Sequence, residues 1–264
     1  MKILVCLKQV PNTTQVKINP ETNTLVRDGV ESIMNPFDEN ALELALQLKE
    51  ANPGTTVTAL TMGPPQAAAI LKEAVARGVD DVVLLCDRAV AGSDTLATSY
   101  ALSCAARKGG DPDLVLFGKQ AIDGDTAQVG PGVATWLGIP CIANVRKCEL
   151  LEGGASVRVE AVFEDSWDVL EAPLPCALTV LKDANVPRMA SLRGKMAAKR
   201  LEVPSTTAAD CNADPAKLGL AASPTHVVRI FSPPPKSGGE TWTGLEPAEA
   251  AKKLADALRE RKLI

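Results

Sequence analysis

The sequence predicts an α/β protein in which a parallel sheet with helices on both faces is extended by antiparallel strands and followed by a C-terminal arm and helix. From residue 2 to residue 138, short apolar runs alternate with stretches in which apolar residues recur at helical spacing. After Pro140, apolar and charged residues alternate one by one, as in half-buried strands. Alternating strands and helices favour a parallel sheet, because parallel strands need a crossover between them.

The composition excludes several classes of function. The 264 residues suffice for a full core, and the formal net charge of -4 gives no reason to expect nucleic acid as a partner. The seven cysteines form no C-x-x-C pair, so no metal site is predicted. His226 is the only histidine, which argues against catalytic triads. No apolar run is long enough to span a bilayer and Met1 leads directly into a strand, so we expect a cytoplasmic protein without a signal peptide.

The first half of the chain supplies the elements of the parallel sheet. Asn35 and Pro36 suit the N-cap and the first position of a helix, and the run Asn52-Pro-Gly54 ends it. Gly78 suits the C-terminal cap of the next helix. The expected strands are 2–7, 55–61, 81–85 and 113–117, with a hairpin of 16–18 and 24–26, and the expected helices are 36–51, 66–77, 95–107 and one that ends at 137.

The second half is predicted to extend this sheet and then to leave it. Period-two alternation over 157–163, continued over 167–170 and 176–181, indicates antiparallel strands. A loop over 185–195 leads into a basic helix, 196–200. Residues 203–244 are rich in Pro, Ser, Thr and Gly, which predicts an arm that lies on a partner, and an amphipathic helix follows over 247–261. We therefore expect an α/β domain over 1–202 and an extended arm with a terminal helix over 203–264.

The run from Leu114 to Pro131 is the strongest candidate for a binding site. An apolar strand ends at Gly118, where the absence of a Cβ lets a ligand approach the backbone. A helix is then expected to start between Asp123 and Gln128, and its first amides suit a phosphate group. The alternative is an ordinary turn in which Asp123 or Thr126 caps the helix.

Other loops are predicted to meet this one. In a parallel sheet, ligands bind beyond the carboxyl ends of the strands. The loops 6–9, 62–64, 87–95 and 118–128 all follow strands. One shared nucleotide pocket is therefore a simpler interpretation than four unrelated loops.

Segments spread along almost the whole chain resemble the β subunit of electron transfer flavoproteins. They include the runs 5–10 (VCLKQV), 35–37 (NPF), 62–64 (MGP), 118–123 (GKQAID) and 187–188 (PR), in the family's order. The resemblance implies a Rossmann-like fold of the adenine nucleotide α-hydrolase type. It also implies a heterodimer with an α subunit that holds a redox-active FAD and carries electrons between dehydrogenases and an acceptor.

The resemblance further implies that this subunit binds an adenine nucleotide. Lys8 and Lys119 can offset phosphate charge or remain solvated, and Asp123 is expected to hydrogen-bond locally. The residues implied at the nucleotide are Cys6, Lys8, Asn35, Pro36, Phe37, Asp38, Met62, Gly63, Gly118, Lys119, Gln120, Ala121, Ile122, Asp123, Gly124, Asp125, Thr126, Ala127, Gln128 and Val129.

The loop from Asp87 to Ser99 resembles the electron-bifurcating branch of the family, in which a second FAD occupies the site where simple members hold a structural AMP. The chemistry fits, because an arginine pairs with phosphate and hydroxyls bond a pyrophosphate or ribityl chain. The branch has phenylalanine where this chain has Val90, and without the family the loop is a helix entrance capped by Ser93. The residues implied here are Arg88, Gly92, Ser93, Asp94, Thr95 and Thr98.

In the family, the loop before the basic helix docks on partner dehydrogenases through a leucine, which here would be Leu192. The alternative for Leu192 is a core contact that holds the loop down. The residues implied in docking are Pro187, Arg188, Leu192, Arg193 and Lys195.

Two other classes of function remain open for such a sequence. An ATP-pyrophosphatase or nucleotidyltransferase on a similar sheet would carry a His-x-Gly-His or Ser-Gly-Gly-x-Asp-Ser loop, of which Gly92-Ser-Asp94 is only a fragment. A nucleotide-binding regulatory module would bind ATP and lack a flavin spectrum. An electron carrier needs no nucleophile or acid–base residue, because the cofactor performs the redox step.

Overall fold

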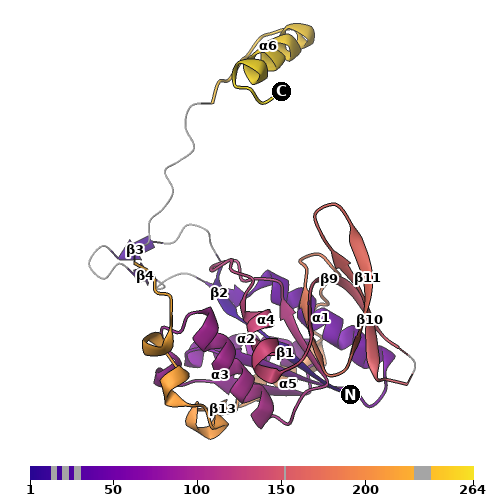
Figure 1. The fold of residues 1–264 in the computed structure, drawn as a ribbon, viewed down its shortest axis with the longest axis vertical. Coiled ribbons are helices and arrows are strands. Elements are labelled where there is room, and N and C mark those ends of the chain that lie inside the picture. The colour runs from indigo at the N-terminus through magenta and orange to yellow at the C-terminus, as the bar shows by residue number, and fades with distance from the viewer. Residues whose placement is uncertain (13–16, 20–23, 27–30, 152, 229–238) are drawn as a thin grey trace. The chain divides into compact units, whose positions relative to one another are not determined.

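The structure, a computed structural model, describes residues 1–12, 17–19, 24–26, 31–151, 153–228 and 239–264 (Figure 1). The chain divides into unit 1, Met1–Arg229, and unit 2, Ile230–Ile264. Residues 203–228, which the composition assigns to the arm, thus belong with unit 1.

Unit 1 is built on a nine-stranded sheet, which confirms the predicted α/β class. Its strand order is β11-β10-β9-β12-β8-β1-β6-β7-β13, and all pairs from β9 to β13 are parallel. The strands are β1 (Lys2–Cys6), β6 (Thr56–Met62), β7 (Asp81–Leu85), β8 (Leu114–Gly118), β9 (Cys141–Leu150), β10 (Ser156–Val162), β11 (Trp167–Pro173), β12 (Cys176–Val180) and β13 (Ser205–Thr206). Two small antiparallel pairs, β2 (Gln9–Pro11) with β5 (Ser32–Met34) and β3 (Lys17–Asn19) with β4 (Thr24–Val26), lie outside it.

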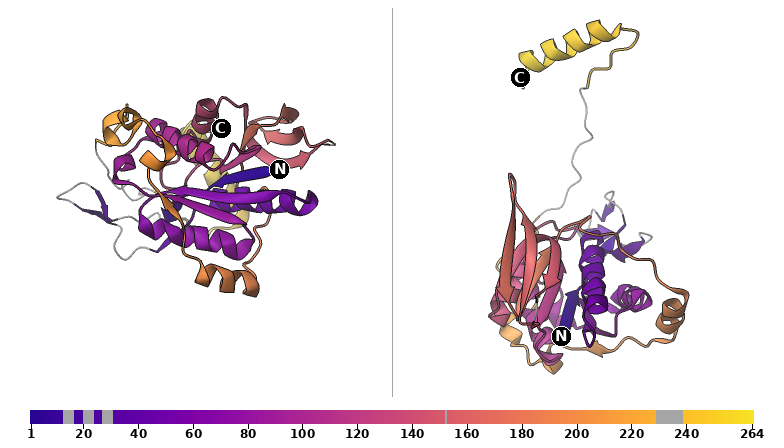
Figure 2. Two further views of the ribbon diagram at one scale, coloured as in Figure 1. Left: turned by 90° about the horizontal axis from the view of Figure 1, so that it is seen from below. Right: turned by 90° about the vertical axis from the view of Figure 1, so that its right-hand side faces the viewer.

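Helices cover both faces of the sheet (Figure 2). The central strands are apolar on both sides: Ile3 and Val5 of β1 pack with α1 and α2, whereas Leu4 and Cys6 pack with α3 and α4. The helices of unit 1 are α1 (Pro36–Ala51), α2 (Ala68–Arg77), α3 (Thr95–Lys108), α4 (Val129–Leu137) and α5 (Leu192–Arg200), with short 3-10 turns η1 (Pro65–Ala67), η2 (Arg88–Val90), η3 (Ala209–Cys211), η4 (Pro215–Lys217) and η5 (Leu220–Ala222).

The structure corrects two predictions about strands. β12 was predicted to be antiparallel, but it pairs in parallel with β8 and β9, and all five of its residues are buried. An unbroken apolar run is typical of a strand buried on both faces of a parallel sheet. β9 was not predicted, and only β10 and β11 form the antiparallel extension. The predicted hairpin of 16–18 and 24–26 is present as β3 and β4, although Val16 and the turn lie outside the described residues.

Three helices begin at different residues from those predicted. α2 begins at Ala68 and not at Gln66, because the 3-10 turn η1 precedes it. α4 begins at Val129, after the whole of the loop 119–128. α5 begins at Leu192 and not at Met196, because the Ser191 side chain caps it by accepting a bond from the Gly194 amide.

The segment 205–222 packs on the helices of unit 1. β13 adds to the edge of the sheet beside β7. Buried residues from this segment, among them Cys211 and Leu218, join the apolar cluster of α3. The Tyr100 hydroxyl of α3 accepts a hydrogen bond from the Asp214 amide at 2.9 Å.

Unit 2 consists mainly of α6 (Pro247–Glu260), which has no buried residue. Lys253 of α6 forms a cation–π contact with Trp242, in which its Nζ lies 4.8 Å from the ring centroid. Apolar residues recur along it at helical spacing, namely Ala250, Leu254, Ala257 and Leu258.

Candidate functional site

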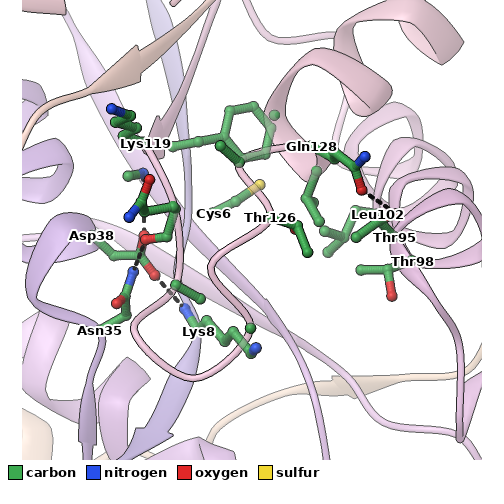
Figure 3. A pocket seen from close by; sticks show the side chains of 18 of the residues that line it. Cys6, Lys8, Asn35, Asp38, Thr95, Thr98, Leu102, Lys119, Thr126 and Gln128 are labelled. Carbon is green, nitrogen blue, oxygen red and sulfur yellow. Dashed lines mark hydrogen bonds between the residues drawn. The ribbon is translucent and has the colours of Figure 1, made fainter. Parts of the chain in front are cut away.

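A cavity of about 350 Å³ opens beyond the carboxyl ends of β1, β6 and β8, between the first turns of α3 and α4 (Figure 3). It brings together parts of the four loops that the sequence assigns to one rim. The predicted residues that line it are Cys6, Lys8, Asn35, Asp38, Met62, Ser93, Asp94, Thr95, Thr98, Gly118, Lys119, Gln120, Ala121, Gly124, Asp125, Thr126, Ala127, Gln128 and Val129.

The cavity wall differs from the prediction in two respects. Predicted residues outside the wall are Pro36, Phe37, Gly63, Arg88, Gly92, Ile122 and Asp123, and residues of the wall that sequence reasoning missed are Leu7, Leu102, Phe117 and Gly130. Helical spacing could have found Leu102, one turn after Thr98, and strand ends could have found Leu7 and Phe117.

Asp38 joins two neighbouring strands beneath the cavity. Its carboxylate accepts hydrogen bonds from the Lys8 amide at 2.7 Å and from the Gly118 amide at 3.1 Å, just beyond β1 and at the end of β8. Burial raises the pKa of Asp38 to about 7. Burial, and then the charge of Asp38, also raise the pKa of the neighbouring Cys6 thiol, so Cys6 stays protonated.

Asn35 orders the long loop instead of capping its own helix. It stands at the N-cap position of α1, but its side chain makes no capping bond. Its Nδ2 donates to the Gln120 carbonyl at 2.8 Å, and its Oδ1 accepts from the Ile122 amide at 3.2 Å. The predicted cap is therefore corrected, because the buried amide group has better partners across the site.

Gly118 is a glycine because helix α1 lies against it. A Cβ at this position would stand 2.3 Å from Asp38 Oδ1 and 2.6 Å from the Phe37 carbonyl carbon. Real Cβ atoms essentially never make contacts this short, so a larger residue would force α1 or β8 to shift. The close approach that the sequence predicts at Gly118 is thus made by the chain itself.

Polar contacts hold the loop 119–128 over the cavity. Lys8 Nζ forms an ion pair with Asp123 Oδ1 at 2.6 Å, and Gln120 donates to the Asp125 carboxylate. Asp125 and Ala127 both have a φ of 54°, a left-handed conformation that non-glycine residues rarely adopt. Such strain is concentrated in binding loops.

The first turn of α4 faces the cavity without a side-chain cap. Gln128 is at its N-cap position and makes no capping bond; its Oε1 instead accepts from Thr95 Oγ1 at 3.0 Å. Val129 and Gly130 line the cavity. Neither Asp123 nor Thr126, the two caps considered from the sequence, caps this helix.

The first turn of α3 is capped by its own chain. The cap is Asp94 and not Ser93: Asp94 Oδ1 accepts from the Leu96 and Ala97 amides at 3.0 and 3.1 Å. Ser93 Oγ instead donates to the Val90 carbonyl and accepts from the Gly219 amide. Thr95 and Thr98 of the same turn line the cavity.

The part of the chain that the structure describes holds no group of three or more His, Cys, Asp or Glu residues suited to a metal ion. Among those residues, no helix is both long and apolar enough to cross a membrane.

Comparison with known proteins identifies the family. The electron transfer flavoprotein domain model matches residues 22–211. A subunit of the caffeyl-CoA reductase-Etf complex, CarD of Acetobacterium woodii, is 48% identical over the full length of both chains. The electron transfer flavoprotein β subunit of Megasphaera elsdenii is 51% identical over 90% of both chains, and the FixA protein of Azorhizobium caulinodans is 46% identical over 98% of this chain and 92% of its own.

The chain belongs to the electron transfer flavoprotein family. Within that family it is related to β subunits along its whole length.

The residues that the family implies in docking lie around the start of α5. Leu192 is 78% exposed, which excludes the alternative of a core contact. Arg193 and Lys195 are exposed and Pro187 is half-buried. Arg188 is not free: its guanidinium binds the carboxylates of Glu43 and Glu50 on α1.

Proposed function

We propose that this β subunit binds FAD in the cavity between α3 and α4, and that with an α subunit it carries electrons between dehydrogenases and an acceptor. The observation that carries the proposal is the uncapped first turn of α4, which faces the cavity beside the hydroxyls of Thr95, Thr98 and Thr126. Unbonded amides at a helix start favour a phosphate group, and hydroxyls suit a ribose or ribityl chain.

The carboxylates of the wall do not oppose this proposal, because protein donors already bind them. Asp38 accepts from two backbone amides, Asp94 from two amides of α3, and Asp125 from Gln120. Lys119 also lines the cavity and can offset phosphate charge. The donor set therefore fits an adenine nucleotide.

FAD is favoured over AMP by which residues line the cavity. Ser93, Thr95 and Thr98, from the segment that resembles the bifurcating branch, line it together with the loop 118–130. The relative in the caffeyl-CoA reductase-Etf complex matches this chain from end to end, which supports the bifurcating branch.

A bound flavin supplies the redox chemistry. The residues of this chain bind, orient and enclose it: Asp38 and Asn35 fix the loops, and the Lys8–Asp123 pair holds the long loop over the cavity. Burial, and then the charge of Asp38, raise the pKa of the Cys6 thiol, which makes this thiol a poor nucleophile.

Cofactor content tests the proposal. The chain is co-expressed with its α subunit, the nucleotides are released by denaturation, and FAD and AMP are counted per heterodimer. We expect two FAD and no AMP. One FAD with one AMP would replace the bifurcating form by the simple carrier, and no nucleotide at all would favour a regulatory module.

A matched pair of variants localises the nucleotide. Thr98→Val removes a hydroxyl from the cavity wall, whereas Thr135→Val removes one from α4 outside it, where Thr135 Oγ1 donates to the Pro131 carbonyl. We expect lower occupancy in the first variant alone. Equal occupancy in both would contradict this site.

A further inference from the structure

Helix α1 holds the chain ahead of α5 through a reciprocal pair of side-chain amides. Asn40 Nδ2 donates to the carbonyl of Asn185 at 2.8 Å, and Asn185 Nδ2 donates to the carbonyl of Asn40 at 2.9 Å. Asn40 Oδ1 also accepts from the Asp183 amide at 3.3 Å. Asn40 is only 3% exposed, so these bonds are shielded from competition by water.

Three residues further along, Arg188 is clamped to the same helix. Its amide and its Nε both donate to Glu43 Oε2, at 3.0 and 2.8 Å, and its Nη2 donates to Glu43 Oε1 at 3.0 Å. Glu50 binds the outer edge of the guanidinium. The Glu43 side chain is 6% exposed and that of Glu50 is 63% exposed, so the inner ion pair is the one sheltered from solvent.

The other end of the segment is fixed on α2. Ser191 caps α5 through the Gly194 amide at 2.9 Å. A Cβ on Gly194 would stand 2.1 Å from the Ala76 carbonyl oxygen, so the first turn of α5 lies directly on the last turn of α2. Residues 185–191 are therefore bound to rigid helices at both ends.

Three side chains within residues 186–192 project outward and are apolar. Val186 is 88% exposed, Met189 is 90% exposed and Leu192 is 78% exposed. Asn185 and Arg188, which face α1, are thus interspersed with apolar residues that face solvent. Apolar side chains gathered on a surface mark interaction sites, and fixing them before binding lowers the entropy cost of association.

We propose that Glu43 and Asn40 are positioning residues for partner docking: by clamping Arg188 and Asn185 they hold Met189 and Leu192 in a preformed apolar projection. This inference rests on the proposed function, in which the chain exchanges electrons with dehydrogenases, and it takes the loop around Leu192, which the family resemblance implies in docking, as the contact with them. In this arrangement Glu43 and Asn40, on the buried face of α1, support electron transfer without contacting the docked partner themselves.

The first test measures loop mobility in the heterodimer, independently of any partner. Trypsin cleaves after Arg188 only when the guanidinium leaves its carboxylates. We expect Glu43→Gln to raise the rate of this cleavage about tenfold, since a buried charged hydrogen bond is lost, and Glu50→Gln to change it less than about twofold. Equal rates in wild type and Glu43→Gln would overturn the inference.

The second test separates KM from kcat. Caffeyl-CoA reductase is the probe partner. It takes electrons from an excess of the saturated acyl-CoA that corresponds to its substrate, and reduction of the heterodimer is followed at varied heterodimer concentration. Glu43→Gln should raise KM about fivefold and leave kcat and FAD content unchanged, because loop order affects association alone. A fall in kcat or FAD content at constant KM would overturn the inference.

A double variant shows whether Glu43 acts through the loop. In Leu192→Ala the apolar contact is already lost, so adding Glu43→Gln should raise KM further by less than about twofold. Independent effects that multiply would overturn the positioning role and leave docking by Leu192 intact. If Leu192→Ala itself leaves KM unchanged, the docking role that the resemblance implies for Leu192 fails, and the inference fails with it, whereas the proposed binding of FAD is untouched.

Discussion

Packing against α1 is what requires a glycine at Gly118, a residue that the sequence pattern connects with a ligand. A Cβ there would collide with the backbone of α1, so Gly118→Ala must shift that helix or β8. We expect the free energy of unfolding to fall by about 3 kcal/mol, as for an overpacked core. Urea denaturation of the purified heterodimer measures this change.

Gly124 provides the matched control. It also lines the cavity, but the nearest atom to an added Cβ is Lys8 Nζ at 4.0 Å. Gly124→Ala should therefore keep its stability within about 0.5 kcal/mol of wild type. Similar losses in both variants would mean that crowding by α1 is not what excludes a side chain at position 118.

The raised pKa of Asp38 predicts how the free energy of unfolding depends on pH. Its pKa is raised from 3.8 to about 7 in the folded protein, first of all by burial. Between these values the folded state keeps a proton that the unfolded chain loses, so this contribution to the free energy of unfolding decreases as pH rises through that range. Glu43 and Glu50 act in the opposite direction, because Arg188 lowers their pKa against the effect of burial.

The comparison of wild type with Asp38→Asn isolates this contribution. We expect the stability of wild type relative to the variant to fall from about pH 4 to about pH 7 and to be constant above that range. Urea unfolding at a series of pH values gives the difference directly. A difference that grows with pH would show that the two amide bonds keep Asp38 ionised.

Residue roles of this kind were only partly predictable. The sequence pattern indicates Ser93 as the cap of α3, but the structure caps this helix with Asp94, and nothing local distinguishes the two residues. The choice depends on Gly219 and Thr225, which bond these side chains from more than a hundred residues away. The ion pairs of Arg188 were not predictable for the same reason, since its partners Glu43 and Glu50 lie on a distant helix.

At the scale of elements, Asp94 connects the start of α3 to the segment around Thr225, near the end of unit 1. Its Oδ1 caps the helix, while its Oδ2 accepts from the amide and the hydroxyl of Thr225 at 3.1 and 2.8 Å. Asp94→Asn should keep the cap and lose bonds to Thr225, because an amide has one acceptor oxygen. Asp94→Ala should lose both and cost about 1 to 2 kcal/mol.

Hydrogen exchange distinguishes these two changes. In Asp94→Asn we expect faster exchange at the Thr225 amide alone, and in Asp94→Ala faster exchange at the Leu96 and Ala97 amides as well. Protection of Thr225 that persists in both variants would mean that Asp94 does not retain this segment.

Which strands pair with one another was the hardest feature to predict from the sequence. The alternation of strands and helices up to residue 138 correctly predicts the parallel sheet and its connections. β12 is apolar throughout, and its parallel partners β8 and β9 are determined by where the chain returns to the sheet. β9 lacks a clear pattern because many of its side chains are only half-buried, and β13 has only two residues.

At the scale of the whole molecule, the cavity was predictable because it follows from topology. Once the strands are parallel, the loops after β1, β6, β7 and β8 lie at one edge, and the structure brings parts of each to one wall. The exceptions come from side chains whose direction topology does not determine. Arg88 is exposed and outside the wall. Asp123 is also outside the wall and forms an ion pair with Lys8.

We expect unit 2 to be stabilised by a partner. α6 carries an apolar stripe, yet none of its residues is buried and Leu254 is 52% exposed. A helix of 14 residues is marginal in water unless its apolar face is covered. The prediction that this part of the chain packs on the α subunit follows from that imbalance.

Removal of residues 230–264 tests this prediction. Unit 1 keeps its sheet and both apolar clusters, so the shortened chain should unfold cooperatively with a free energy within about 1 kcal/mol of the full chain. Its affinity for the α subunit should fall at least about tenfold, since the apolar stripe of α6 is lost from the interface. Calorimetry of the separated subunits measures both quantities, with a full-length Leu254→Ser variant as the control for the stripe. An unchanged affinity in both forms would show that α6 is not part of the subunit interface.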